Sequence, residues 1–414
     1  MKTERPRTYE EAGELLAGAA ADGRAVRFRG GGTKLGWGRP VPEPDLELCT
    51  GGLDRVLEHN AGDFTAVLQA GVPLAVAQDV VAAAGQMLAL DPPLSPWGGA
   101  GDDAAIEAAD AGATIGGIVA TNDSGPLRHH YGGVRDLVVG VTVVLSDGTI
   151  ARAGGKVIKN VAGYDLGKLF AGAFGTLGLI AEVTVRLHPK PARTATVIAR
   201  SADPGQLTRA AAVLAHAPLE ADCLDLWWDA AADAAPPGAA DPPGASAPSG
   251  AGAVLVRFGS ADPGPRAEEA AALLGTVGGL AVETDNDDEA CWEAQRAAQR
   301  GDVVVKVSAL PAALPAAIAA TQALGGTMVA RAGLGLAWIQ LPGGADHGAT
   351  VEAVGALRRR LAPAPCVLLD APADVRAALD PWGGETGPVA LMGKVKERFD
   401  PAGICAPGLF VGGI

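Results

Sequence analysis

A run of three glycines directly after a strand-like segment constrains this chain most. The stretch AVRFRG (25–30) alternates like a half-buried strand, and the glycines follow it within FRGGGTKLGWG (28–38). Glycines at such a place either form a turn or let backbone N–H groups surround a phosphate. Neither GxxxxGK[ST] nor a GxGxxG run after a strand is present, which excludes the two standard phosphate motifs. The local pattern leaves both interpretations open.

The flanking patterns predict an α+β fold for residues 1–190. Thr8 and Glu11 form a T-x-x-E capping box that opens a helix ending near Ala21. Residues 91–136 show little helical periodicity and are expected to be irregular, which in a compact domain indicates either a functional segment or a wrong assignment. The remaining expected elements are strands at 45–50, 55–60 and 65–71, a helix at 73–85, a hairpin at 137–155, a helix around 163–172 and a strand at 179–189.

Pro189 and Pro191 indicate a domain boundary. Strand and helix patterns alternate after it and predict a second α+β domain over 191–385. Residues 230–252 consist almost wholly of Ala, Pro, Gly, Ser and Asp, which predicts a flexible surface insertion. Residues 386–414 contain a helix and then the Pro/Gly-rich run FDPAGICAPG, expected to be coil.

Composition excludes some classes of function. The formal net charge of −14 argues against a nucleic-acid partner, which needs a basic face. The five cysteines lie far apart with no CxxC pair, so we expect buried apolar side chains rather than an iron–sulfur cluster or a zinc site. The charged start resembles no signal peptide and no apolar run is long enough to span a membrane, so we expect a cytoplasmic protein.

Two further segments carry candidate chemistry. TIGGIVATNDSG (114–125) combines two glycines, which let a ligand approach the backbone, with hydroxyl and amide side chains. Its alternative interpretation is an ordered surface loop. GYDLGKLFAGAFGTLGLIAEVTVRL (163–187) by itself is a helix packed on a strand through small residues.

In their order and spacing, these three segments resemble the FAD-binding domain of the vanillyl-alcohol oxidase and p-cresol methylhydroxylase (PCMH) superfamily. QAGVPL (69–74) and RHHYGGVRDLVVG (128–140) belong to the same match, which covers about residues 5–190. KNVAGYDLGKLFAGAFGTLG (159–178) is closest to the 2-hydroxy-acid dehydrogenase branch, and LMGKVKERFDPAGICAPG (391–408) resembles the segment with which that branch returns to the flavin domain. The whole chain is most similar to the FAD-binding subunits of bacterial glycolate oxidases.

The resemblance implies a fold and a cofactor. The fold is a two-subdomain PCMH-type FAD-binding domain (1–190), a ferredoxin-like α+β cap domain (191–385) and a C-terminal segment (386–414) that returns to the first domain. Some relatives hold the flavin covalently through a histidine where this chain has Thr33, so we expect non-covalent FAD. The residues expected to hold the pyrophosphate or line the flavin, or to lie near the adenine or ribose end, are Arg29, Gly30, Gly31, Gly32, Thr33, Lys34, Thr114, Gly116, Gly117, Asn122, Gly125, Ile180 and Glu182.

One departure from the family concerns catalysis. Catalytic relatives carry a GDGNxH motif in the second domain, which serves the substrate and a metal, whereas this chain has only GGADHG (343–348). We therefore expect no metal. His129 and His130 are candidates to take a proton from a 2-hydroxyl group, with a structural histidine pair as the alternative. Arg128 and Arg331 are candidates to clamp a carboxylate, with surface ion pairs as the alternative.

The expected function is that of an FAD-binding subunit of a glycolate oxidase-type complex. It would transfer a hydride from a 2-hydroxy acid such as glycolate to FAD and pass the electrons to a partner. A catalytic flavoprotein paralogue and an iron–sulfur subunit are the expected partners, and association with the inner face of the membrane would come through them. The alternatives are a self-sufficient FAD-dependent dehydrogenase of another alcohol, and a structural flavin-binding subunit that supports a catalytic paralogue.

Overall fold

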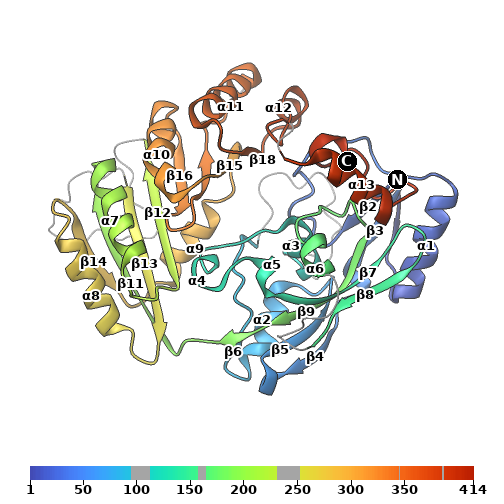
Figure 1. Ribbon diagram of the computed structural model, residues 1–414, viewed down its shortest axis with the longest axis horizontal. Coiled ribbons are helices and arrows are strands. Elements are labelled where there is room, and N and C mark those ends of the chain that lie inside the picture. Colours follow the sequence, from blue (N-terminus) through green and yellow to red (C-terminus); the bar gives the residue numbers. More distant parts are fainter. Residues whose placement is uncertain (95–111, 157–164, 231–251, 345, 385–386) are drawn as a thin grey trace. The chain divides into compact units, whose positions relative to one another are not determined.

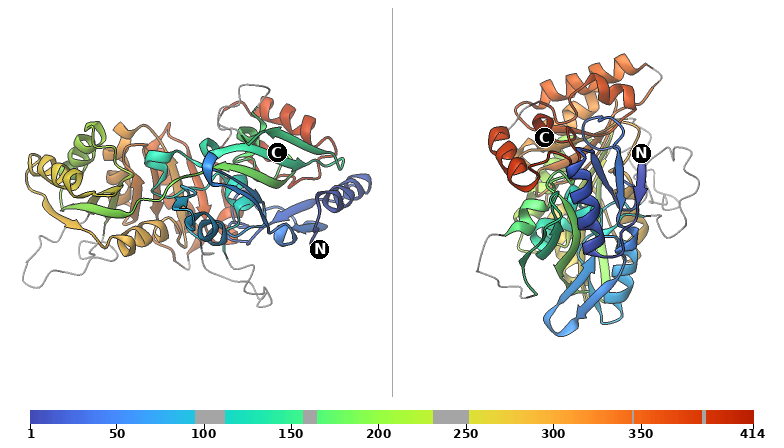
Figure 2. Two further views of the ribbon diagram at one scale, coloured as in Figure 1. Left: turned by 90° about the horizontal axis from the view of Figure 1, so that it is seen from below. Right: turned by 90° about the vertical axis from the view of Figure 1, so that its right-hand side faces the viewer.

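The computed structural model forms two compact units (Figure 1). The first unit comprises Met1–Ser124, Gly132–Lys190 and Gly384–Ile414, and the second comprises Gly125–Tyr131 and Pro191–Gly383. Both chain termini belong to the first unit (Figure 2). The insertion expected near 230–252 falls outside the described residues except at its two ends. The described residues are 1–94, 112–156, 165–230, 252–344, 346–384 and 387–414.

Among its described residues, the first unit contains two larger sheets and a two-stranded one. A three-stranded parallel sheet has the order β1-β3-β2, and a five-stranded antiparallel sheet has the order β4-β5-β9-β7-β8. Short strands β6 and β10 pair with each other. The strands are β1 (Lys2–Glu4), β2 (Val26–Arg29), β3 (Leu46–Cys49), β4 (Val56–Asn60), β5 (Thr65–Gln69), β6 (Gln86–Met87), β7 (Val138–Val144), β8 (Ile150–Gly154), β9 (Leu179–Arg186) and β10 (His188–Pro189). The helices are α1 (Tyr9–Ala21), α2 (Leu74–Ala82), α3 (Ile115–Thr121), α5 (Val134–Leu137), α6 (Leu166–Phe170) and α13 (Val389–Phe399).

Local chemistry explains why helix α1 begins where it does. Thr8 Oγ1 accepts a hydrogen bond from the backbone N–H of Glu11 at 3.1 Å, which confirms Thr8 as the N-cap. The other half of the predicted capping box differs, because the Glu11 carboxylate accepts from the N–H of Arg7 at 2.6 Å. Ala12, Leu16 and Ala19 recur at the helical period and are fully buried. They pack in one apolar core with Leu46, Leu48, Val144, Leu179, Ala181 and neighbouring side chains of both sheets.

The hairpin β7–β8 also follows from its sequence. Gly148 in the turn has φ +86°, and Asp147 Oδ1 accepts from the N–H of Thr149 at 2.9 Å, so the Ser-Asp-Gly turn is confirmed. The expectation for residues 91–136 was wrong in part. Among the described residues of that stretch, the structure has three short helices: α3, α5 and, in the second unit, α4 (Arg128–Tyr131).

The second unit contains one eight-stranded antiparallel sheet with the order β14-β11-β13-β12-β16-β17-β15-β18. Its strands are β11 (Arg193–Ser201), β12 (Cys223–Asp229), β13 (Gly252–Ser260), β14 (Ala281–Asp285), β15 (Val304–Ser308), β16 (Thr327–Arg331), β17 (Leu336–Gln340) and β18 (Cys366–Asp370). Besides α4, its helices are α7 (Pro204–His216), α8 (Gly264–Gly275), α9 (Glu289–Ala297), α10 (Leu314–Ala323), α11 (His347–Leu361) and α12 (Ala373–Ala378).

This sheet consists of two ferredoxin-like βαββαβ motifs joined edge to edge. The first motif is β11-α7-β12-β13-α8-β14, and the second is β15-α10-β16-β17-α11-β18. In each motif the first strand lies between the third and the fourth, and the two motifs meet where β12 pairs with β16. The second α+β domain was expected to contain a ferredoxin-like fold, and the structure contains that motif twice.

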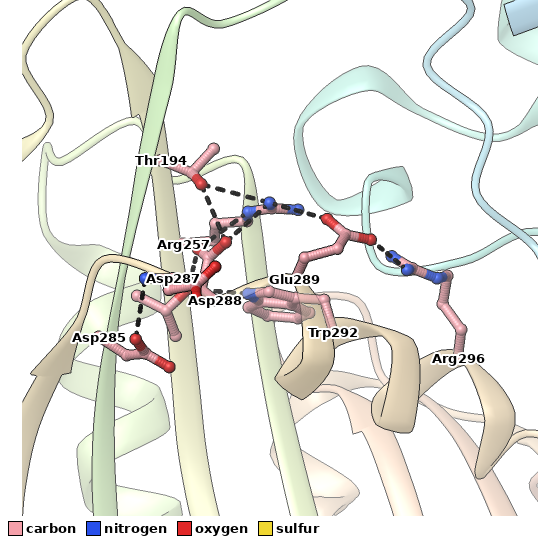
Figure 3. A network of polar contacts seen from close by, with 9 residues as sticks. Thr194, Arg257, Asp285, Asp287, Asp288, Glu289, Trp292 and Arg296 are labelled. Atoms are coloured by element: carbon pink, nitrogen blue, oxygen red, sulfur yellow. Dashed lines mark hydrogen bonds and ion pairs between the residues drawn. The ribbon is translucent and has the colours of Figure 1, made fainter. Parts of the chain in front are cut away.

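The two faces of this sheet differ in chemistry. One face packs on α7, α8, α10 and α11 through a continuous apolar core that includes Val197, Leu226, Val256 and Ile339. On the other face, some strand residues are apolar and others carry polar side chains that contact α9 and its start, as Figure 3 shows for one part of the sheet. There Arg257 of β13 pairs with Asp288 at 2.9 Å, and the indole N–H of Trp292 donates to Thr196 Oγ1 at 2.8 Å (Figure 3). Three further residues labelled in Figure 3 belong to the same network: Thr194, Glu289 and Arg296.

Candidate functional site

The glycine-rich loop begins at Gly30, where strand β2 ends. A Cβ atom on Gly30 would lie 2.1 Å from Thr114 Oγ1, so only glycine fits against this side chain. Gly32 has φ +74°, a conformation that residues with a side chain rarely adopt. The structure thus brings together the first two sequence segments predicted to form the cofactor site.

The second segment forms helix α3, with Thr114 as its N-cap. Thr114 Oγ1 accepts from the N–H of Gly117 at 3.3 Å. The N–H of Ile115 donates to Val72 O at 2.9 Å and that of Gly116 donates to Ala70 O at 2.8 Å. The first amides of this helix are therefore used within the protein. A bound diphosphate would have to take its hydrogen bonds from the glycine-rich loop.

The loop has donors to offer. Within the described part of the chain, no acceptor takes a hydrogen bond from the backbone N–H of Gly30, Gly31 or Gly32. These residues are half-buried. Consecutive free amides around a residue with positive φ are the arrangement that binds phosphate oxygens. The loop is therefore suited to bind phosphate oxygens, such as those of a diphosphate.

Lys34 adds a positive charge to this loop. Its Nζ atom lies 3.3 Å from Asp123 Oδ2, and both side chains are almost completely buried. It also donates to Thr33 Oγ1 at 3.3 Å. Asp123 is held in turn by the N–H of Ser124, which donates to its Oδ1 atom at 2.9 Å. The pair connects the glycine-rich loop to the turn after helix α3, so these two segments are fastened at a second point.

Asn122 ends helix α3 in the left-handed conformation, with φ 51°. Its Oδ1 atom is buried and has no hydrogen-bond partner among the described residues. A buried acceptor without a partner costs free energy, and a polar ligand would remove that cost. A Cβ on Gly172 would lie 3.1 Å from Asn122 Cβ, so the loop after helix α6 passes here too.

Other predicted cofactor residues have partners within the protein. Arg29 Nε donates to Glu47 Oε1 at 2.8 Å. Glu182 of β9 accepts from the hydroxyl groups of Tyr9 at 2.9 Å and Thr142 at 3.0 Å. Burial, and then Glu182, raises the pKa of Tyr9 to about 12. Ile180 is buried in the same strand, and Gly125 begins the short segment that belongs to the second unit.

The histidine pair lies on helix α4 of the second unit. His129 packs beside Gly333, where an added Cβ would lie 2.8 Å from its Cε1 atom. Burial, and then the charge of His130, lowers the pKa of His129, so its imidazole is neutral at neutral pH. His130 is exposed, and its ring makes an edge-on contact with Tyr131 at 4.7 Å. Arg128 begins the same helix and is half-buried.

Arg331 lies on β16 and is completely buried. Its Nη1 atom donates to Asp225 Oδ2 at 2.7 Å, its Nη2 atom donates to Gln299, and its guanidinium stacks 4.8 Å from the ring of Trp338. Burial raises the pKa of Asp225 to about 6 although Arg331 lowers it. A guanidinium held this way is not open to a substrate carboxylate, which departs from the predicted role as a clamp.

The ion pairs of Asp123 with Lys34, of Asp225 with Arg331 and of Asp400 with Lys396 were not predicted from the sequence. Only the i, i+4 spacing of the last pair left a local signal. All five cysteines are buried, as expected, and none of them forms a disulfide bond. The described residues contain no group of three or more His, Cys, Asp or Glu side chains placed to hold a metal ion. A search of the described helices found none with the length and apolar character that a membrane crossing requires.

Comparison with known proteins agrees with this geometry. Residues 3–102 and 104–154 match the FAD binding domain family, and the matched part contains the glycine-rich loop and helix α3. A solved alkyldihydroxyacetonephosphate synthase superposes with a TM-score of 0.67 and 16% identity, covering 98% of this chain and 76% of that one. This likeness confirms the α+β fold.

Three curated proteins show the range of relatives. Over 194 residues the chain is 35% identical to glycolate oxidase subunit GlcD of Bacillus subtilis, covering 47% of this chain and 38% of that protein. Over 179 residues it is 33% identical to glycolate oxidase subunit GlcE of Escherichia coli, covering 43% and 46%. Over 195 residues it is 35% identical to a D-lactate dehydrogenase of Archaeoglobus fulgidus, covering 47% and 40%. The matches span less than half the length of these relatives.

Proposed function

We propose that the protein is a flavoprotein subunit of a 2-hydroxy-acid-oxidising complex of the glycolate oxidase type, because its first part matches the FAD binding domain family. The observation that carries the proposal is the contact of Gly30 with Thr114. This contact fixes a loop of free backbone amides beside helix α3, within the part of the chain that matches the family. The relatives supply the substrate class, since they include two glycolate oxidase subunits and a D-lactate dehydrogenase.

In this proposal the protein binds and orients, and FAD when bound accepts a hydride from carbon 2 of the hydroxy acid. The amides of Gly30, Gly31 and Gly32 hold the diphosphate without a covalent bond, and Lys34 offsets part of its charge. Loss of the hydride and of the hydroxyl proton converts the 2-hydroxy acid into a 2-oxo acid. His129 is the candidate for that proton, because its neutral imidazole can accept one.

The electrons then leave to a partner in this proposal. Two relatives carry names of oxidase subunits, which supports assembly with other chains. An iron–sulfur subunit is the expected acceptor, because the five cysteines of this chain are buried and lie far apart. A catalytic flavoprotein paralogue is the second expected partner.

A second candidate function is a flavin-binding subunit that supports a catalytic paralogue without turning over substrate itself. The observation that favours it is the burial of Arg331 against Asp225, which removes one predicted carboxylate clamp from reach. Under this alternative the cofactor site is the same and only the substrate chemistry moves to the partner.

One experiment separates these two functions. The purified chain is loaded with FAD, and the flavin absorbance is followed anaerobically during addition of glycolate or D-lactate. Bleaching by the chain alone supports hydride transfer in this chain. Flavin binding without bleaching, with bleaching restored when a catalytic paralogue is added, supports the supporting subunit. A chain that gains no flavin absorbance contradicts both, and release of the flavin by acid precipitation confirms non-covalent binding.

A further inference from the structure

The C-terminal segment, residues 388–414, is built into the first unit next to strand β2. The N–H of Val26 donates to Ile404 O at 2.8 Å, and that of Ala406 donates to Val26 O at 2.8 Å, so the segment extends the parallel sheet beside β2. Farther along, the N–H of Arg39 donates to Leu409 O at 2.9 Å. A Cβ on Gly38 would lie 2.9 Å from that same oxygen. The C-terminal segment thus contacts the chain on both sides of the glycine-rich loop, at Val26 before the loop and at Gly38 and Arg39 where the loop ends.

The same segment contacts the loop between α6 and β9. Phe170 of α6 packs edge-on against Phe399, and Phe174 packs against Phe410, each pair with ring centroids 5.6 Å apart. Gly175 of this loop lies against Phe28 of strand β2, where an added Cβ would be 3.0 Å from the ring. Residues 388–414 therefore bridge two of the three sequence segments assigned to the cofactor.

Lys396 of α13 is the centre of this bridge. Its Nζ atom donates to Thr176 O at 2.7 Å, to Cys405 O at 2.7 Å and to Asp400 Oδ2 at 2.6 Å, which uses all three of its donors. Asp400 is buried and also accepts from the N–H groups of Ile404 at 3.2 Å and Cys405 at 2.8 Å. Two of these acceptors belong to the C-terminal segment itself, and the third, Thr176 O, is 220 residues away in the sequence.

We propose that Lys396 is a positioning residue of the cofactor site, which couples closure of the C-terminal segment to the binding of FAD. Val26 begins the strand that leads into the glycine-rich loop, and Arg39 follows the loop. The backbone groups of both residues are hydrogen-bonded to the segment that Lys396 holds. The amides of the glycine-rich loop can point together at a diphosphate only if strand β2 and the loop 171–178 keep the positions that they have in this structure.

In this proposal, FAD binding and closure of the C-terminal segment are thermodynamically linked. If FAD binds more tightly to the closed form, opening the segment lowers the affinity for FAD by the differential affinity of the two forms. Lys396 touches only backbone carbonyls and Asp400 among its described contacts, so its removal leaves the loop's own donors intact. The inference concerns the FAD-binding domain and holds whichever substrate or partner the proposed function involves.

The test compares Lys396→Met with Lys394→Met in the full-length chain stripped of flavin. Lys394 is exposed on the same helix, so its substitution controls for the loss of one positive charge. FAD affinity is measured by titration, and hydrogen exchange is measured at the amides of Ala406 and Arg39. For Lys396→Met we expect FAD affinity to fall about 5- to 100-fold with faster exchange at both amides, and for Lys394→Met neither to change.

A milder variant guards against misfolding. Phe410→Ala removes one ring contact with Phe174 and leaves the hydrogen bonds of Lys396 in place. We expect its exchange rates and its FAD affinity to lie between those of the wild type and Lys396→Met. Faster exchange with unchanged FAD affinity, in either variant, overturns the inference. Because no substrate is added, failure of this test is distinguishable from failure of the proposed function.

Discussion

Gly30 and Thr114 lie so close together that no side chain larger than hydrogen fits between them. A Cβ on Gly30 would stand 2.1 Å from Thr114 Oγ1, the atom that also caps helix α3. Gly30→Ala must therefore push the loop away from the helix or displace the N-cap. We expect the FAD affinity to fall by at least about tenfold, and the free energy of unfolding of the apoprotein to fall by about 1–3 kcal/mol.

The matched control is Gly36→Ala in the same loop, because a Cβ added there would have no described heavy atom within 4 Å apart from those of its chain neighbours. FAD titration and urea unfolding of both variants measure the effect. Equal FAD affinities in the two variants would show that the contact of Gly30 with Thr114 is irrelevant to the cofactor.

Lys34 has two separable roles, as the partner of Asp123 and as a charge near the diphosphate. Lys34→Met leaves Asp123 buried without its ion pair, and we expect a loss of stability of about 3–5 kcal/mol. Lys34→Met combined with Asp123→Asn removes both charges and should recover most of that stability. We expect the double variant to remain weak in FAD binding, since the positive charge is still missing. Thermal unfolding and FAD titration of the two variants separate the roles, and a double variant with wild-type FAD affinity would leave Lys34 only its structural role.

The extent to which the fold could be predicted depends on how local its causes are. Helix α1 and the β7–β8 hairpin follow from residues next to them, the cap Thr8 and the turn glycine Gly148. Helix α3 was missed because it spans only Ile115–Thr121 and depends on backbone bonds to the distant residues Ala70 and Val72. Only the resemblance, and no local pattern, pointed to the meeting of the glycine-rich loop with this helix.

The charged partners at the candidate sites could not be predicted, because they are set by tertiary structure. Nothing near Arg331 in the sequence indicates that strand pairing places it opposite Asp225. The sequence therefore left it as a possible clamp or a surface ion-pair residue, and the structure buries it. The same holds for Lys396, whose acceptor Thr176 lies in another sequence segment.

The burial of Arg331 leads to a prediction about stability rather than flavin binding. Arg331→Met leaves the carboxylate of Asp225 buried without its ion-pair partner, and we expect the free energy of unfolding to fall by about 3–5 kcal/mol. Asp225→Leu together with Arg331→Met should recover most of this loss. FAD bound per folded molecule should stay the same in both variants. Urea unfolding and flavin absorbance measure the two quantities, and stable Arg331→Met protein with wild-type unfolding would contradict the structural role.

Asp225 also gives stability a pH dependence of known sign. Its pKa is raised from 3.8 to about 6 by burial, so the folded state binds the proton more tightly than the unfolded state does. Its contribution to stability is full below pH 3.8 and is lost as the pH rises through 6. The double variant that lacks both charges should therefore lose less stability than the wild type between these two values. Equal slopes of unfolding free energy against pH in the two proteins would contradict this assignment.

Asp400 gives a dependence of opposite sign in the C-terminal segment. Burial alone would raise its pKa, but the hydrogen bonds from Lys396 and from the amide of Cys405 outweigh this and hold the pKa below the ordinary 3.8. Its stabilising contribution is therefore complete above pH 3.8 and is lost as the pH falls through the lower, folded value. We expect the stability difference between the wild type and Asp400→Asn to be constant above about pH 5 and to shrink below about pH 4.

The accompanying control is Glu397→Gln, which removes one exposed negative charge from the same helix. Urea unfolding of the apoprotein at a series of pH values gives the stability differences, and exchange at the amide of Ala406 reports whether the segment has opened. Because protonated Asp400 no longer pairs with Lys396 as an ion, exchange at Ala406 should rise at the pH where the stability difference shrinks. A stability difference that persists to the lowest pH, with Ala406 still protected, would mean that the segment is held by its ring contacts and backbone bonds and that the charge of Asp400 adds nothing.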